Sequence, residues 1–322
     1  MIEIYQRDAT GEVGKVIDCA IALTQKGLVW IDLDDPTEAE ELQVEAALGV
    51  DVLTAFERRA YEDSARFYEE NGALYLTVTL LARRDDGPFR ADAVTFILTD
   101  AGTLVTVRQI HPRAFSIGQG RSLARITQAR GGGDVLMALL DACVERIADL
   151  LQENTAAANA VSQEIFNERR NAAADVRATL RTLGRLGTLA ALSHDSLSSL
   201  QRAATFAALH DATVYGLEPA RLTALRRDTE QLERAIEAFQ SHLTFLQEAM
   251  LGLVGAAQNN TLRALSLATI AFVPPTLIAS IFGMNFTAMS WFQASWGPPA
   301  AFLLMLGAPA ALFAIAKWRR WF

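Results

Sequence analysis

The stretch "AFVPPTLIASIFGMNFTAMSW" (271–291) holds the most informative pattern in this chain of 322 residues. An apolar run with two adjacent prolines ends in Gly-Met-Asn, and an uncharged stretch follows. Residues 264–282 contain 19 consecutive positions without an ionisable side chain, and residues 298–316 form a second such run. Each run approaches the roughly 20 residues that a helix needs to cross a bilayer. The sequence therefore predicts two membrane-spanning helices.

Charges that flank the two runs predict their orientation. Arg263 precedes the first run, and Lys317, Arg319 and Arg320 follow the second within an aromatic and basic cluster typical of a membrane interface. The connecting residues 286–297 include no Lys or Arg. Because positive flanks favour the cytoplasmic side, both termini are predicted to be cytoplasmic, in a multi-pass protein of the cell (inner) membrane. A buried hairpin of core helices is the alternative interpretation.

The rest of the chain has the composition of an acidic soluble protein. The whole chain has a net charge of -8, which argues against a nucleic-acid partner, since such proteins normally carry a basic face. Cys19 and Cys143 are far apart and form neither a metal-binding spacing nor a disulfide framework, which fits a reducing compartment. The polar start, "MIEIYQRDAT", does not have the pattern of a secretory signal peptide.

Composition also divides the residues that precede the apolar runs. Residues 1–132 alternate β-type runs with helical ones and predict a cytoplasmic α/β domain, in which Thr37 and Glu40 form a capping box. A hairpin turn is predicted at "AGT" (101–103). Residues 133–218 are rich in Ala, Leu, Glu and Arg and predict a helical cytoplasmic segment. Strands are expected at 28–33, 74–82, 94–99 and 103–108.

Within the helical part we expect one helix over about 134–169, capped by Asp134, and shorter helices over 172–212. No helix breaker separates Pro219 from Pro274, so a stalk helix over 219–282 should continue into the first transmembrane helix. It would be about 95 Å long and would need neighbouring helices or copies of itself. The remaining segments are a loop with the Gly-Met-Asn motif (283–297), transmembrane helix 2 (298–316) and a basic tail (317–322).

Enzyme signatures are missing from the sequence, so no enzymatic activity and no cofactor are predicted. There is no GxxxxGK[ST] loop and no HExxH motif, and the four histidines are scattered. Ser193-His194-Asp195 is consecutive and cannot align as nucleophile, base and orienting group. Several acidic helical residues are expected to form a solvated face, and a minority of them to be available for a divalent cation. These are Glu164, Glu168, Asp175, Asp228, Glu230, Glu233 and Glu237.

A stripe of small and apolar residues follows one face of the first apolar run. Small hydroxyl side chains are common where membrane helices pack closely, and they equally suit the wall of a narrow pore. Spacing alone favours neither interpretation. Steps of three and four residues place on this stripe Leu262, Ser266, Thr269, Val273, Thr276 and Ser280, with Leu265 beside it and Gly283 at its end.

Gly283-Met284-Asn285 resembles the signature of the CorA superfamily of divalent metal-ion transporters, which includes CorA-like and ZntB-like members. The segments "WIDLDDPTEAEE" (30–41), "VTFILTDAGTLVTVR" (94–108) and "QNNTLRALSLATIAFVPPT" (258–276) resemble family segments in the same order. The resemblance covers essentially the whole chain. It implies an α+β fold with long stalk helices and two C-terminal transmembrane helices, assembled with itself as a funnel-shaped homopentamer in the lipid bilayer.

The resemblance also implies roles for individual residues. Asn285 would face the pore axis with Thr276 deeper in the pore, and Leu262, Leu265 and Val273 would form apolar constrictions. Hydrated Mg²⁺ keeps its waters tightly, and the amides of Asn285 would bind it through those waters. The implied function is uptake of Mg²⁺, with Co²⁺ or Ni²⁺ as further cargo, driven by the membrane potential. The divalent cation is then the transported substrate.

Two departures from the family pattern affect the choice of ion and its regulation. The loop residues 286–297 lack the acidic residue that many members carry after the motif, so Mg²⁺ selectivity is open and a ZntB-like zinc transporter is the alternative. Ala224 stands where the family's sensing aspartate would fall, and Asp228 is expected to point elsewhere on the helix. A membrane scaffold without transport is the more remote alternative.

Overall fold

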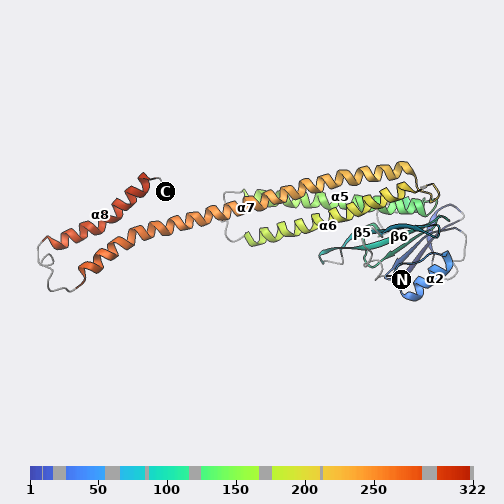
Figure 1. Ribbon diagram of the computed structural model, residues 1–322, viewed down its shortest axis with the longest axis horizontal. Coiled ribbons are helices and arrows are strands. Elements are labelled where there is room, and N and C mark those ends of the chain that lie inside the picture. The colour runs from blue at the N-terminus through green and yellow to red at the C-terminus, as the bar shows by residue number, and fades with distance from the viewer. Residues whose placement is uncertain are drawn as a thin grey trace. The chain divides into compact units, whose positions relative to one another are not determined.

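The computed structural model describes residues 1–8, 10–16, 27–54, 66–83, 87–115, 125–166, 176–210, 213–284 and 296–319. The chain forms two compact units, residues 1–170 with 177–246, and residues 171–176 with 247–322 (Figure 1). The strands are β1 (Ile2–Arg7), β2 (Val13–Val16), β3 (Leu28–Asp34), β4 (Phe67–Glu70), β5 (Ala73–Arg83), β6 (Phe89–Thr99) and β7 (Leu104–Arg108). The helices are α2 (Glu38–Leu48), the 3-10 turn η2 (Arg113–Phe115), α5 (Gly132–Ile165), α6 (Val176–Leu209), α7 (Pro219–Phe282) and α8 (Gly297–Trp318).

A mixed sheet organises the first unit. The strand order is β2-β1-β3-β7-β6-β5-β4, with β3 and β7 parallel and the other pairs antiparallel. The four predicted strands are confirmed as β3, β5, β6 and β7. The strands β1, β2 and β4 escaped prediction because they are short, lie toward the edges and contain many polar residues.

The two faces of the sheet bury different side chains, as the alternation along a strand requires. Trp30 and Phe96 face one core, which α5, α6 and the first part of α7 complete. Ile31 and Val105 face the other core, where Val44 of α2 packs. The predicted α/β domain is therefore a sheet covered by helices on both faces.

The start of α5 corrects one prediction. Asp134 lies in the first turn of the helix, where its carboxylate accepts the Arg130 N–H at 3.0 Å, and Gly131 is the N-cap. The reason is close packing: a Cβ on Gly132 would collide with the backbone of Leu104, and the Gly132 N–H donates to the Gly102 carbonyl at 2.6 Å. Helix α5 therefore begins at Gly132, ahead of the predicted start at residue 134.

Helix α6 corrects another prediction, since it is one helix of 34 residues where shorter helices were expected. Gly184 and Gly187 lie inside it. A glycine costs a helix only about 1 kcal/mol relative to Ala. The packing of Leu183, Leu186 and Leu197 into the core outweighs that cost.

Two local predictions are confirmed. The amide and the hydroxyl of Thr37 donate to the Glu40 carboxylate at 2.9 and 3.2 Å, which forms the capping box at the start of α2. Gly102, with φ of +81°, lies in the turn between β6 and β7. A left-handed backbone of this kind favours glycine.

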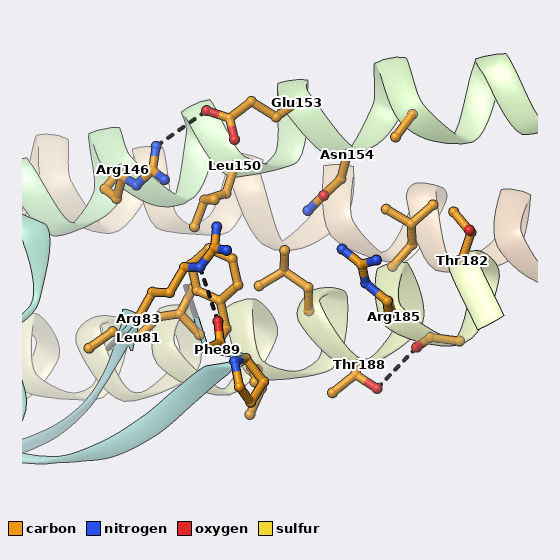
Figure 2. A pocket seen from close by; sticks show the side chains of 18 of the residues that line it. Leu81, Arg83, Phe89, Arg146, Leu150, Glu153, Asn154, Thr182, Arg185 and Thr188 are labelled. Carbon is orange, nitrogen blue, oxygen red and sulfur yellow. Dashed lines mark hydrogen bonds and ion pairs between the residues drawn. The ribbon is translucent and has the colours of Figure 1, made fainter. Parts of the chain in front are cut away.

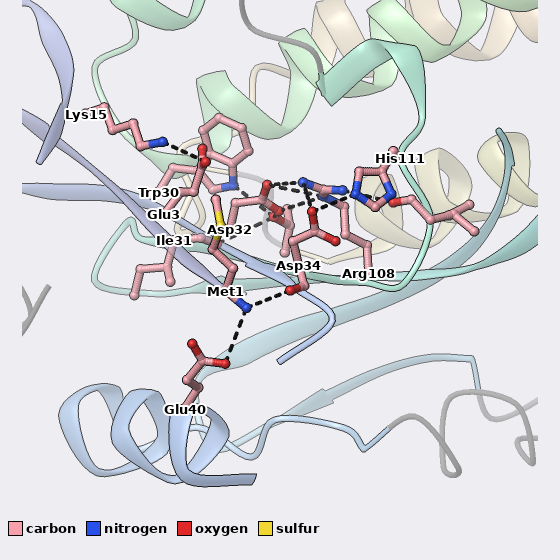
Figure 3. Close-up of polar contacts among 12 residues, drawn as sticks. Met1, Glu3, Lys15, Trp30, Ile31, Asp32, Asp34, Glu40, Arg108 and His111 are labelled. Carbon is pink, nitrogen blue, oxygen red and sulfur yellow. Dashed lines mark hydrogen bonds and ion pairs between the residues drawn. The ribbon is translucent and has the colours of Figure 1, made fainter. Parts of the chain in front are cut away.

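A network of charges centred on the buried pair Asp32 and Arg108 joins β3 to β7 (Figure 3). Arg108 Nη2 lies 2.8 Å from Asp32 Oδ2 and 3.1 Å from Asp34 Oδ2, and His111 Nε2 lies 3.0 Å from Asp34. Burial alone would lower the pKa of Arg108, but its hydrogen bonds and the charge of Asp32 raise it above the ordinary value. Removing Asp32 would leave Arg108 buried without its main partner, so this network ties the two strands together.

Candidate functional site

The C-terminal part of α7, together with α8, carries large apolar side chains that the single chain does not cover. Phe272 on α7 is 72% exposed and Leu303 on α8 is 75% exposed. Both helices are long and apolar enough to cross a membrane. A continuous apolar surface of this kind requires lipid or further protein around it.

The predicted stripe lies on α7, which is continuous from Pro219 to Phe282. From Leu262 to Ser280 the stripe runs roughly 27 Å at 1.5 Å per residue, close to the roughly 30 Å of a hydrocarbon core. Steps of three and four residues keep its members on one side of the helix. Leu262, Leu265 and Val273 are 59%, 64% and 55% exposed, so the single chain leaves this side open.

Three hydroxyl groups on the stripe each donate to the backbone carbonyl four residues earlier. The hydroxyls of Ser266, Thr269 and Thr276 donate to the carbonyls of Leu262, Leu265 and Phe272 at 2.9, 2.9 and 2.6 Å. A carbonyl has no proton to give, so each hydroxyl must be the donor and its oxygen keeps lone pairs free to accept. Along this side α7 therefore offers hydrogen-bond acceptors.

Two prolines, Pro274 and Pro275, lie inside α7 without ending it. Neither has a backbone N–H, so the carbonyls of Ile270 and Ala271 lose their usual helical donors. Inside a membrane such carbonyls need other partners. The Thr276 hydroxyl contacts the Phe272 carbonyl and therefore does not satisfy them.

The Gly-Met-Asn motif follows the last residue of α7. The Gly283 N–H donates to the Ala279 carbonyl at 2.9 Å and the Met284 N–H to the Ile281 carbonyl at 3.4 Å, so helical bonding extends into the motif. A Cβ on Gly283 would lie 3.1 Å from the Ala279 carbonyl oxygen, tighter than ordinary contact. Asn285 and most of the following loop, 286–295, lie outside the described residues.

The stalk part of α7 corrects the expectation for Asp228. Ala224 and Asp228 are both exposed and are four positions apart in one helix, so they lie on the same side, one turn apart.

Burial raises the pKa of Glu233 on the same helix. The charge of His194 opposes this increase, and the charges of Glu237 and Glu230 add to it. Across the described ranges no three His, Cys, Asp or Glu side chains gather as a metal site. Glu168 and Asp175 are outside those ranges.

The family that matches this chain is described as CorA-like Mg2+ transporter protein, and the match covers residues 25–320. This chain belongs to that family. The resemblance seen in the sequence is thereby confirmed, and members of the family are transporters, not enzymes. The magnesium transport protein CorA of Wolinella succinogenes is 29% identical over 298 residues, which is 90% of this chain and 91% of the relative.

Solved structures share the fold. The complete structure of the CorA magnesium transporter from Methanocaldococcus jannaschii matches with a TM-score of 0.74 at 16% identity, over 98% of this chain and 97% of that one. The ZntB cytoplasmic domain from Vibrio parahaemolyticus matches with a TM-score of 0.60 at 12% identity, over 79% and 98%. The sheet, the long helix and the two apolar helices are thus those of a CorA-type membrane transporter of divalent cations.

Proposed function

We propose that this chain takes up Mg²⁺ through a central pore of a homopentamer, with the stripe of α7 as the pore wall. The observation that carries the proposal is the row of acceptor oxygens on Ser266, Thr269 and Thr276. The waters of a hydrated cation point their protons outward and need acceptors. Since Mg²⁺ gives up its waters reluctantly, neutral acceptors that bind the hydrated ion suit it.

Within this proposal, the selective entrance is formed by Gly283, Met284 and Asn285. Thr276 accepts hydrogen bonds from the waters of the hydrated ion deeper in the pore. Leu262, Leu265 and Val273 form apolar constrictions that gate by dewetting. Ser266, Thr269 and Ser280 complete the wall. The acceptors hold no charge, so the ion is not trapped on its way through.

The membrane potential supplies the driving force in this proposal. A divalent ion that crosses 100 mV gains roughly 4.6 kcal/mol, at about 2.3 kcal/mol for each elementary charge. Arg263 before the first apolar run and Lys317 and Arg319 after the second favour cytoplasmic termini, so the loop 286–297 lies outside. Uptake therefore runs from the motif toward the stalk.

A zinc transporter of the ZntB type is the second candidate, because the loop 286–297 has no acidic residue and a ZntB cytoplasmic domain also matches in fold. Co²⁺ and Ni²⁺ are further candidate ions for the same pore. Purified full-length protein in liposomes, with an internal fluorescent reporter for each ion, separates them. We expect Mg²⁺ entry, and Zn²⁺ entry without Mg²⁺ entry would contradict the proposal.

Asn285→Ala tests the entrance in the same liposomes. We expect loss of ion flux in a protein that still assembles, because the ring of amide acceptors is gone. Asn260→Ala is the matched control, since Asn260 is exposed and lies roughly half a turn away from the stripe on α7. Unchanged flux in Asn285→Ala, as a membrane scaffold predicts, would contradict the assigned role.

A further inference from the structure

The first unit contains a large basic pocket whose lining includes no residue of the stripe on α7. It has a volume of about 1300 Å³ and lies between the ends of β5 and β6 and the helices α5 and α6 (Figure 2). One acidic side chain lines it among the described residues, Glu153, which is 64% exposed. The basic side chains that line it are Arg83, His111, Arg113, Arg146, Arg181 and Arg185.

The described residues compensate the positive charge of this pocket only in part, since Arg146 pairs with Glu153 and His111 with Asp34. Arg181 and Arg185 are four positions apart on α6, where two like charges destabilise a helix unless an anion lies between them. Neither they nor Arg113 forms an ion pair with a residue that the structure describes. This accumulation occurs in a chain whose net charge is -8. The pocket is therefore suited to an anion with several negative charges.

Arg146 and Arg83 are held in place at the other side of the pocket. Arg146 on α5 lies 3.4 Å from Glu153 and its side chain is only 23% exposed. Arg83 Nε donates to the Gly87 carbonyl at 3.0 Å. Figure 2 shows Arg185 and Asn154 directed into the space between α6 and α5. Guanidinium groups from three elements thus converge on one volume.

One end of the pocket is apolar and aromatic. The guanidinium carbon of Arg83 lies 5.6 Å from the centre of the Phe89 ring. Pro88, Leu81 and Leu150 line the pocket beside this pair. An arginine stacked near an aromatic ring forms a flat surface on which a planar heterocycle packs.

We propose that this pocket binds a nucleoside polyphosphate. Arginine forms paired hydrogen bonds to phosphate oxygens, so Arg181, Arg185 and Arg146 would hold the phosphates. The surface of Phe89 and Arg83 would receive the base. Sites for small molecules usually have volumes of about 300–1,000 Å³, so this pocket is large enough to hold such a ligand.

Such a ligand would join the α5–α6 helices to the β5–β6 hairpin. Its phosphates would contact the helices and its base would contact the hairpin. Binding would therefore link these two parts of the first unit. The proposal stands on the pocket alone and does not depend on which ion the protein transports.

The test is isothermal titration calorimetry of the full chain in detergent with ATP, in EDTA so that no divalent cation contributes. We expect binding that is at least tenfold weaker in the double variant Arg181→Gln/Arg185→Gln. The charge-matched control is Arg177→Gln/Arg227→Gln, which removes two exposed arginines outside the pocket. Absence of ATP binding, or equal loss in the control variant, overturns the proposal.

Two further ligands separate the parts of the site. Adenosine lacks the phosphates, and we expect it to bind at least tenfold more weakly than ATP. Inorganic triphosphate lacks the base, and we expect it also to bind more weakly. Phe89→Ala should reduce the advantage of ATP over inorganic triphosphate. Equal binding of ATP and inorganic triphosphate by the unmodified protein overturns the assignment of a nucleoside ligand.

Discussion

The two units of this protein place the same kinds of side chain in opposite surroundings. Trp30 and Phe96 in the sheet are fully buried, whereas Phe272 on α7 and Leu303 on α8 are 72% and 75% exposed. In the first unit the chain itself removes apolar surface from water. In the second, lipid or further copies of the chain must do so. The difference separates the residues that fold the protein from those that place it in a membrane.

The largest expected effect is the loss of a large core side chain. Trp30→Ala should cost about 3–5 kcal/mol of unfolding free energy, since the indole is fully buried, stacks on Tyr5 and donates to Thr106 at 3.0 Å. Phe272→Ala, on the exposed side of α7, should change it by less than about 0.5 kcal/mol. Denaturant unfolding of the full chain in detergent measures both. Equal effects would remove the distinction between the two units.

The second largest expected change in unfolding free energy comes from removing the partner of a buried charge. Asp32→Ala should cost about 3 kcal/mol because Arg108 would remain buried without its main partner. Glu230→Ala removes only an exposed pair with Arg234 at 3.9 Å and should cost less than about 0.5 kcal/mol. The same unfolding measurement applies, and Asp32→Ala with unchanged stability would contradict the role given to the network.

Two glycine-to-alanine substitutions in helices should change the unfolding free energy by smaller amounts and in opposite directions. Gly132→Ala should destabilise by about 1–3 kcal/mol, since the added methyl group would collide with the backbone of Thr103 and Leu104. Gly187→Ala, with open space around it, should stabilise α6 by about 0.5–1 kcal/mol. A stabilised Gly132→Ala would show that α5 does not depend on this close approach.

Local patterns made much of the fold predictable from the sequence. The capping box at Thr37, the turn at Gly102 and the apolar runs each depend on a few neighbouring residues. The start of α7 and its long course followed from Pro219 and the absence of a helix breaker before Pro274. The stripe was visible because helical spacing alone determines which residues share a side.

Long-range packing made the rest unpredictable. Asp32 and Arg108 are far apart in sequence and meet only because β3 pairs with β7. Gly132 begins α5 because of the backbone of Leu104, which no local pattern reveals. The basic pocket combines residues of two strands, η2 and two helices. The side of α7 that faces a pore remains a prediction.

The smallest expected effect concerns Cys143. Burial raises the pKa of its thiol to about 12, so at pH 8 it should remain protonated and should not react with a charged methanethiosulfonate reagent. Labelling of the Cys19→Ser variant, followed by mass spectrometry, measures this. Rapid labelling would contradict the burial of Cys143. An unreactive Cys143 provides a silent background for cysteines introduced on α7.

One side of α7 is proposed to face a water-filled path. In the Cys19→Ser background, Thr276→Cys lies on the stripe, and Ile278→Cys lies about 200° further around the helix at nearly the same depth. Both are assayed for Mg²⁺ flux in liposomes before and after a charged methanethiosulfonate reagent. We predict that the reagent blocks flux in Thr276→Cys and leaves Ile278→Cys unchanged. Block of Ile278→Cys with no effect on Thr276→Cys, or no effect on either, would contradict the account.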